Sequence, residues 1–297
     1  MTSQSTESEL TKINLLIMVY FALIESLELA VKCDVDTNRA ELIKRVFPQQ
    51  AADALLDDGA HTPVLHRDAT VFFSDVAGFV ELSQELGPID TLKMLDLLFS
   101  EMDKCVQQVP GVYKVSGRAS CVASISSAQH LVTSPPLTPP THTAMPPLPL
   151  PFAQVETIGD AYMVVATNQE GGGTLDASKY AEMVCSFALL VQQRCAGLKF
   201  RGRELRLRMG VHSGSCVSGI VGSIMPRYCF FGATINIASR LENSGEVGRI
   251  HLSTETAELL RELGNPAFAL TEREGRVQLK GVKEPVQSFW LSATPPI

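Results

Sequence analysis

The 297-residue chain carries a formal net charge of −7, and 45% of its residues are hydrophobic, enough for a sizeable core in one large domain or two small ones. The negative charge argues against a protein that coats nucleic acid, although a nucleotide that brings its own cations remains compatible. Seven cysteines, an odd number without a CxxC pair, indicate reduced thiols in a cytoplasmic compartment and no disulfide framework.

The N-terminal part predicts helices ahead of a larger domain. Residues 1–37 are expected to form a helical lead-in, which could be truncated, and residues 38–66 a linker helix into a domain at 67–293. Residues 15–24 are an unbroken apolar run, shorter than the roughly 18 residues that a membrane span requires. We expect this run to pack on protein, although the chain could also be a fragment of a membrane-attached protein. No secretory signal is evident.

The larger domain shows alternating strand and helix patterns. A predicted strand at 70–75 is followed by a helix whose apolar residues share one face: Leu92, Leu95, Phe99, Met102 and Val106. A second helix repeats that spacing at Val184, Phe187, Ala188 and Val191. Apolar residues alternate with arginines from Leu205 to Met209, as in a half-buried strand.

A hairpin turn is predicted at 158–161, between two β-rich runs. The order strand, helix, hairpin, helix, strand predicts a ferredoxin-like βαββαβ sandwich of the α/β (α+β) class. We expect its helices on one face of the sheet and additional strands and helices after Val217.

The segment from Val115 to Gln154 departs from this order. It contains eight of the chain's 17 prolines, a single Arg118 and no acidic residue. One interpretation is a disordered surface loop. A long structureless loop inside a compact domain is uncommon, however, which favours a different origin for the segment.

The codons that this segment permits indicate a translated intron. Val115-Ser116 can be encoded by GTGAGT, a strong splice donor, and residues 147–154 by a pyrimidine tract that ends in CAG. Removing residues 115–154 joins Lys114 directly to Val155 and restores one uninterrupted strand. Sequencing the transcript would decide whether the mature protein contains the segment.

Five short motifs follow one another along the chain: FSDVAGF (73–79), VETIGDAY (155–162), MGVHSG (209–214), MPRYCFFG (225–232) and NIASR (236–240). With residues 115–154 set aside, the chain from about 38 to 291 resembles the catalytic domain of class III nucleotidyl cyclases, and within them the eukaryotic guanylyl cyclases. Any one motif is weak evidence, but five in order are strong. The resemblance implies the nucleotide cyclase fold and a phosphorus–oxygen lyase that converts GTP to cyclic GMP and pyrophosphate.

The resemblance assigns metal binding to the strand ends. An aspartate at a strand end is by itself more often a turn or helix cap than a ligand. Here the family implies that Asp75, Asp160 and the carbonyl of Val76 bind two Mg²⁺ or Mn²⁺ ions per site, since hard divalent cations prefer oxygen ligands. Such ions would activate the ribose 3′-hydroxyl for attack on the α-phosphate and would hold the leaving pyrophosphate.

The turn after the first aspartate is expected to bind phosphate. Gly78 and Phe79 open a helix, and free N–H groups at a helix N-terminus suit phosphate oxygens. The family has a hydroxyl residue where this chain has Val80. Loss of that contact would weaken binding by about 1 kcal/mol and does not disqualify the site.

Base choice is implied by Glu156 and Cys229. An ionised glutamate only accepts hydrogen bonds, so it can pair with the N1–H and N2–H₂ donors of guanine but not with N1 of adenine. A cysteine offers a weak S–H donor to guanine O6. Guanylyl cyclases carry this Glu and Cys pair, whereas many adenylyl cyclases carry Lys and Asp. Cys229 alone would be read as a buried thiol.

The resemblance makes Asn236, Arg240 and Lys280 the catalytic residues. Asn236 and Arg240 lie four residues apart, on one face of a predicted helix, where most such pairs are simply solvated. In the family their counterparts orient the ribose and stabilise the transferring phosphate, a role that suits the permanently charged guanidinium. Lys280 matches a lysine that contacts the triphosphate, and Lys283 could replace it.

Each active site in this family is shared between two subunits, and this chain carries both sets of residues. We therefore expect a homodimer with two shared sites, or a heterodimer with a related cyclase chain, and no nucleic-acid partner. An adenylate cyclase is one alternative. A non-catalytic module for dimerisation or nucleotide binding is another if residues 115–154 persist, because they enter a strand just before Glu156. The regulatory input cannot be read from the sequence.

Overall fold

The computed structural model describes residues 63–109, 112–115, 160–168, 176–222 and 227–294, with a few isolated helical positions between 40 and 56. The chain divides into two compact units, Met1–Thr62 and Pro63–Ile297. The predicted apolar run at 15–24, and most of the linker helix at 38–66, lie outside the described residues. No helix in the described ranges is long and apolar enough to cross a membrane.

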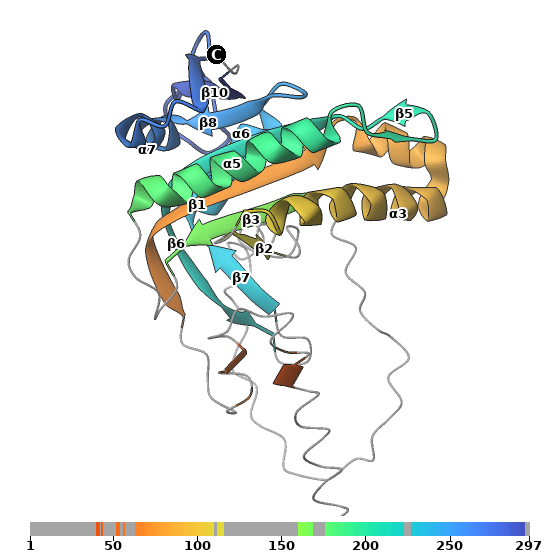
Figure 1. Cartoon of the computed structure of the whole chain (residues 1–297), viewed down its shortest axis with the longest axis horizontal. Coiled ribbons are helices and arrows are strands. Elements are labelled where there is room, and N and C mark those ends of the chain that lie inside the picture. Colours follow the sequence, from red (N-terminus) through yellow and green to blue (C-terminus); the bar gives the residue numbers. More distant parts are fainter. Residues whose placement is uncertain are drawn as a thin grey trace, which may run out of the picture. The chain divides into compact units, whose positions relative to one another are not determined.

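A mixed sheet forms the centre of the second unit (Figure 1). Its eight described strands are β1 (Val64–Val76), β2 (Tyr113–Val115), β3 (Tyr162–Thr167), β6 (Leu207–Val221), β7 (Arg227–Phe231), β8 (Ile250–Ser253), β9 (Phe268–Glu272) and β10 (Ser288–Ala293). The order is β2-β3-β1-β6-β8-β10-β9, with β7 paired to β6. A separate hairpin joins β4 (Lys199–Phe200) to β5 (Arg203–Glu204).

Four described helices of this unit are α3 (Phe79–Val106), α5 (Ala177–Cys195), α6 (Ala233–Asn243) and α7 (Thr254–Leu263). The succession β1-α3-β2-β3-α5-β6, with sheet order β2-β3-β1-β6, confirms the predicted ferredoxin-like core. Helices α3, α5 and α7 contribute to one apolar cluster, and α6 contributes to a second. The two helices of this core, α3 and α5, share one sheet face as expected, and α6, one of the additional elements after Val217, covers the other face.

The apolar residues of strand β1 explain why helices pack on both faces of the sheet. Phe72 and Val76 belong to the cluster with α3 and α5, while Val71 and Phe73 belong to the cluster with α6. Successive side chains of a strand point to opposite faces, so a continuous apolar run is typical of a strand buried on both sides. Because β1 lies between β3 and β6, its C-terminal residues, including Asp75, are flanked by a strand on each side.

The two long helices differ in how well their buried faces were predicted. In α5 the residues Val184, Phe187, Ala188 and Val191 are all fully buried, as expected. In α3 the buried residues are Met94, Leu98, Met102 and Cys105, whereas Leu92 is 69% exposed. The assignment of Leu92 to the buried face was wrong. Helix α3 is interrupted by a non-helical Gly87 and by Pro88, so the phase of its second half is set by packing on the sheet.

Strand β2 pairs antiparallel with β3, with Tyr113 opposite Val165 and Val115 opposite Met163. This pairing brackets the predicted turn at 158–161, of which Asp160 and Ala161 are described. The segment from Val115 to Gln154 contributes its first residue to β2, and the rest of it lies outside the described residues. In a chain without residues 115–154, Val155 would follow Lys114 and so take the place opposite Met163.

Candidate active site

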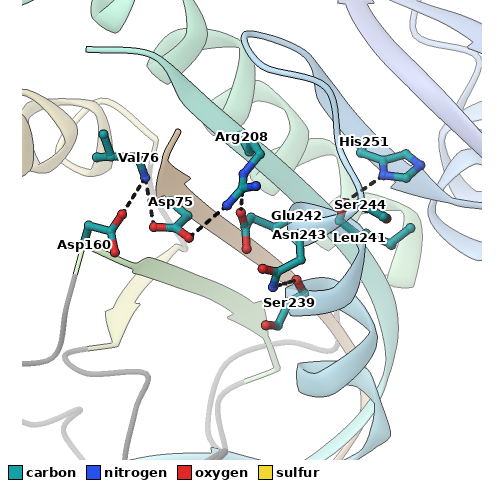
Figure 2. A network of polar contacts seen from close by, with 10 residues as sticks. All are labelled: Asp75, Val76, Asp160, Arg208, Ser239, Leu241, Glu242, Asn243, Ser244 and His251. Atoms are coloured by element: carbon teal, nitrogen blue, oxygen red, sulfur yellow. Dashed lines mark hydrogen bonds and ion pairs between the residues drawn. The ribbon is translucent and has the colours of Figure 1, made fainter. Parts of the chain in front are cut away.

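Asp75 and Asp160 lie together at one end of the sheet. Asp75 is the penultimate residue of β1, and Asp160 precedes β3, which pairs antiparallel with β1 so that Ser74 faces Tyr162. The backbone N–H of Val76 donates to both carboxylates, at 2.9 Å to Oδ1 of Asp75 and 3.0 Å to Oδ2 of Asp160. Figure 2 shows the two side chains converging on this nitrogen. The structure thus brings together the three residues that the sequence predicts as metal ligands.

The start of β3, next to Asp160, is anchored in the core. The ring of Tyr162 is stacked on Phe187 of α5, with 6.5 Å between ring centroids, and its hydroxyl donates to Asp103 of α3. Because Tyr162 is only 3% exposed, these contacts hold the end of the strand against both helices. Asp160 therefore projects from a well-packed support, although the residues before it lie outside the described ranges.

The surroundings of Asp160 change its acid–base chemistry. Partial burial, followed by the hydrogen bond and negative charge of Asp75, raises the pKa of Asp160 to about 7. A place that is unfavourable for two anions is favourable for a cation between them. Two carboxylates with one nearby carbonyl match the few protein oxygens that Mg²⁺ typically takes, with phosphates and water completing its shell. With two carboxylates, this site has fewer acidic ligands than a three-residue metal site, and no group of three or more His, Cys, Asp or Glu that could hold a metal ion occurs among the described residues.

This raised pKa predicts a pH dependence of stability. A carboxyl whose pKa is higher in the folded than in the unfolded state contributes stability below about pH 4, and the contribution is lost as the pH rises through about 7. The melting temperature of the metal-free protein should therefore fall across this window, and less so in Asp160→Asn. Mn²⁺ should raise the melting temperature more at about pH 8 than at pH 6, since the cation must displace a proton. Thermal unfolding with and without Mn²⁺ measures both effects, and parallel pH profiles of the two proteins would contradict the prediction.

Arg208 joins this site, and the sequence interpretation missed it. It lies on β6 opposite Asp75, and its Nη2 is 3.3 Å from Oδ2 of Asp75. Its Nε is 3.2 Å from Oε1 of Glu242 on α6. The alternation from Leu205 to Met209 predicts that Arg208 faces away from Leu207 and Met209, but it cannot show which acidic groups it meets across the sheet.

The turn between β1 and α3 has the expected form. Gly78 is the N-cap of α3 in a left-handed conformation, with φ 74°, and Phe79 begins the helix. The N–H of Leu82 bonds to the carbonyl of Gly78, which closes the first turn. The side chain of Val80 is 61% exposed, so it points to solvent and does not cover the N-terminus of helix α3. The N–H groups of this turn stay candidates for phosphate binding.

The residues predicted for the second half of the site lie on β7, α6 and a nearby loop. Cys229 is buried on β7 opposite Gly219. Asn236 and Arg240 are both half-buried on α6, which confirms the predicted helix. A β-carbon on Gly281 would lie 3.3 Å from a guanidinium nitrogen of Arg240, so this arginine packs against Gly281, the residue after the exposed Lys280. Glu156 lies outside the described residues.

His212, from the MGVHSG motif, has a structural environment. It is 5% exposed, its Nδ1 lies 2.8 Å from the hydroxyl of Ser253, and burial lowers its pKa. A neighbouring cavity of about 250 Å³ is lined by several acidic residues, among them Asp68, Glu255 and Glu258. Neither Asp75 nor Asp160 lines this cavity, and its negative walls do not suit a triphosphate.

The fold and these motifs identify the family. Residues 63–134 and 150–293 match the family model described as Adenylate and Guanylate cyclase catalytic domain, and the chain belongs to this family. The match is interrupted between residues 134 and 150, within the segment from Val115 to Gln154.

Two relatives are a natriuretic peptide receptor and a receptor-type guanylate cyclase. The chain is 34% identical over 258 residues to atrial natriuretic peptide receptor 2 of Anguilla japonica, covering 86% of this chain and 20% of the receptor. It is 32% identical over 261 residues to receptor-type guanylate cyclase Gyc76C of Drosophila melanogaster, covering 88% of this chain and 14% of that protein. The chain therefore spans about a fifth or less of the length of these two relatives.

A solved structure agrees in fold. The guanylate cyclase domain of RhGC from Catenaria anguillulae, in complex with GTP, superposes with a TM-score of 0.56 at 26% identity. The superposition covers 77% of this chain and 98% of that domain. The chain is thus a cyclase catalytic domain, of a family whose members depend on divalent metal ions.

Proposed function

We propose that this chain is the catalytic part of a guanylate cyclase, which converts GTP to cyclic GMP and pyrophosphate. The observation that carries the proposal is the convergence of Asp75 and Asp160 on one backbone N–H, with the guanidinium of Arg208 beside them. Two crowded carboxylates suit divalent cations, and a fixed positive charge next to them suits a triphosphate. Guanine is favoured as the base because Glu156 can accept from both of its edge donors.

The residues of this chain have separate roles in the proposed reaction. When bound at Asp75, Asp160 and the carbonyl of Val76, two Mg²⁺ or Mn²⁺ ions would lower the pKa of the ribose 3′-hydroxyl and neutralise the triphosphate. The N–H groups after Gly78 would bind phosphate oxygens at the start of α3. Arg208 would add a permanent positive charge beside Asp75.

The second half of the proposed site orients the nucleotide. Glu156 and Cys229 would bind the guanine edge, Asn236 would hold the ribose, and Arg240 with Lys280 would stabilise the charge on the phosphates. We infer that these groups act on a nucleotide held by the aspartates of another subunit. A head-to-tail homodimer would then contain two equivalent sites, as the two-fold symmetry of such dimers requires. A heterodimer with a related cyclase chain is the other possible assembly.

We also infer a cytoplasmic location for this domain. Cys105, Cys185, Cys195 and Cys216 are buried free thiols, which is typical of proteins in reducing compartments. The two relatives named above are receptors several times longer than this chain, which supports a place within a longer, membrane-attached protein.

The assay that tests the proposal compares the two purine nucleotides. Protein lacking residues 115–154 is incubated with GTP or ATP and with Mn²⁺ or Mg²⁺, and the cyclic nucleotide formed is measured. Cyclic GMP from GTP, at a rate well above that of cyclic AMP from ATP, supports the proposal. A faster reaction with ATP would indicate an adenylate cyclase, and no product from either nucleotide would contradict a catalytic role.

Exchanging the base-selecting pair should change this preference. In the double variant Glu156→Lys, Cys229→Asp, the lysine meets the guanine donors with donors of its own, while the new groups match adenine. We expect the ratio of kcat/KM for GTP over ATP to fall by about 10²-fold or more, since a site built on polar pairing discriminates strongly. Steady-state kinetics with both nucleotides measures the ratio. Glu258→Gln, which makes the same net charge change on the exterior of α7, is the control, and an unaltered ratio in the double variant would contradict the assignment.

A further inference from the structure

Helix α6 lies directly against the backbone of β6. A β-carbon at Gly210 would lie 2.2 Å from the backbone nitrogen of Glu242 and 2.6 Å from the carbonyl oxygen of Ala238. Distances this short require the helix to move, so only glycine allows the present approach. The separation of α6 from β6 is therefore set by this contact.

Glu242 projects from the buried face of α6 toward the candidate metal site. Its side chain is 0% exposed, and its Oε1 lies 3.2 Å from Nε of Arg208. The same guanidinium reaches Oδ2 of Asp75 with Nη2, at 3.3 Å. Figure 2 shows Arg208 between the two carboxylates. One planar cation thus joins a predicted metal ligand on β1 to a buried acid on α6.

Burying the charge of Glu242 at this core-facing position of α6 costs free energy, even though the carboxylate is paired with Arg208. Glu242 follows Ile235, Ala238 and Ser239 on one helical stripe, where an apolar residue would pack on β6 without the cost of burying a charge. Buried ion pairs often stabilise a protein less than apolar residues of similar size. A guanidinium, however, has a rigid fork whose orientation is determined by its partners. The pairing with Nε leaves Nη2 directed at Asp75.

The C-terminal end of α6 is held as firmly as its buried face. Nδ1 of His251 donates to the carbonyl of Leu241 at 2.8 Å, so its Nε2 is the acceptor for the hydroxyl of Ser288, also at 2.8 Å. Arg273 donates to the carbonyl of Ser244 at 2.8 Å. Burial lowers the pKa of His251 to about 4, which keeps the ring neutral near pH 7. The ring lies against Trp290, with centroids 4.7 Å apart. Helix α6 is therefore a rigid base for Glu242.

We propose that Glu242 is a positioning residue for the metal site. Its carboxylate holds Arg208 so that the guanidinium contacts Asp75 through one nitrogen and leaves the rest of that carboxylate available to a cation. Without the charge of Glu242, the guanidinium turns fully to Asp75 and competes with the cation for its oxygens. The inference rests on the proposed function in one respect, that Asp75 binds a metal ion.

The test measures metal binding directly. Free Mn²⁺ is followed by electron paramagnetic resonance during titration of the full chain in the presence of α,β-methylene GTP, which cannot release pyrophosphate. Glu242→Gln, which keeps the size of the side chain and removes its charge, should bind Mn²⁺ about fivefold more weakly, the effect of one partly exposed ion pair. Glu242→Asp keeps the charge and should bind Mn²⁺ more tightly than Glu242→Gln.

Two controls separate positioning from other effects. Glu101 lies on α3, and its Oε2 is 3.6 Å from Nη1 of Arg194. The variant Glu101→Gln removes the charge of this glutamate and should bind Mn²⁺ as the wild type does. In an Arg208→Gln background the substitution Glu242→Gln should no longer change the affinity, because the residue acts through the guanidinium. Melting temperatures are measured for every variant, since a purely structural role would lower them and leave the Mn²⁺ affinity of the folded protein unchanged.

The outcomes distinguish a failure of the inference from a failure of the proposed function. A wild-type chain that binds no Mn²⁺ with the analogue overturns both. A wild type that binds Mn²⁺ and a Glu242→Gln variant with the same affinity overturn the inference alone. So does an equal loss of affinity with and without Arg208, which would mean that Glu242 acts only as a distant charge.

Discussion

Removal of residues 115–154 is expected to raise the rate of cyclic GMP formation at least about tenfold, because displacements near 1 Å at an active site can cost about 100-fold in rate. The segment enters between Lys114 of β2 and Glu156, the predicted guanine ligand, and precedes Asp160. In the shortened chain Val155 takes the register position that Val115 holds opposite Met163. A valine thus replaces a valine, and the strand next to β3 is otherwise unchanged. Initial rates of the two purified forms, at saturating GTP and Mn²⁺, give the comparison.

The control for this gain is the shortened chain with Asp160→Asn, which should form no more cyclic GMP than the background. It shows that the added activity arises at the predicted site and not from a contaminant. Equal output from the long and short forms would contradict the view that the segment disturbs catalysis. A dominant transcript that retains the corresponding nucleotides would contradict the intron hypothesis, whatever the rates.

The substitution Asp75→Asn in the shortened chain should lower kcat by about 10³-fold or more, since a bound metal ion supplies several kcal/mol of transition-state stabilisation. An amide retains the size of the carboxylate but not its charge. Asp68→Asn, at an exposed position near the other end of β1, makes the same change away from the site and should leave kcat within about twofold of the wild type, as surface substitutions usually do. Nearly normal turnover by Asp75→Asn would rule out this aspartate as a metal ligand.

Mixing subunits tests whether the site is shared. Asp75→Asn and Arg240→Ala chains should each be nearly inactive alone. Random pairing places half of the chains in mixed dimers, each with one intact site, so about a quarter of the wild-type activity should return. Mixtures that stay inactive would indicate that each subunit carries a complete site of its own. Size-exclusion chromatography of the mixture confirms that dimers form.

Much of the fold could be predicted from local patterns, and the failures have physical causes. The apolar run at β1 indicates a buried strand, and the apolar periodicity of α5 indicates a helix with one buried face. The sequence of α3 contains two overlapping apolar stripes, and the break at Gly87 and Pro88 removes any phase carried over from its first turn. Packing on the sheet selected the stripe with Met94 and left Leu92 exposed. The position of α6 on the opposite face depends on long-range contacts that no local pattern contains.

The candidate site could be predicted only in part. The motifs pointed to Asp75 and Asp160, and in the structure Asp75 lies at the end of β1 and Asp160 just before β3, where this antiparallel pair brings the two together. They did not give Arg208 and Glu242, whose contacts join strand and helix across the sheet. A signal existed for Glu242, since it continues the buried stripe of Ile235 and Ala238, where an acidic residue is out of place. Its partner, however, could be found only from the tertiary structure.

The packing of His251 against Trp290 gives the protein a built-in optical probe. Trp290 is the chain's single tryptophan, and Arg249 and Arg273 lie over its ring, at 4.1 and 5.1 Å from the centroid. Its intrinsic fluorescence therefore comes from one place, beside the imidazole that binds the last turn of α6. Nucleotide or metal binding that shifts this helix should change the emission of the unlabelled protein, so movement at the base of the site can be followed in real time.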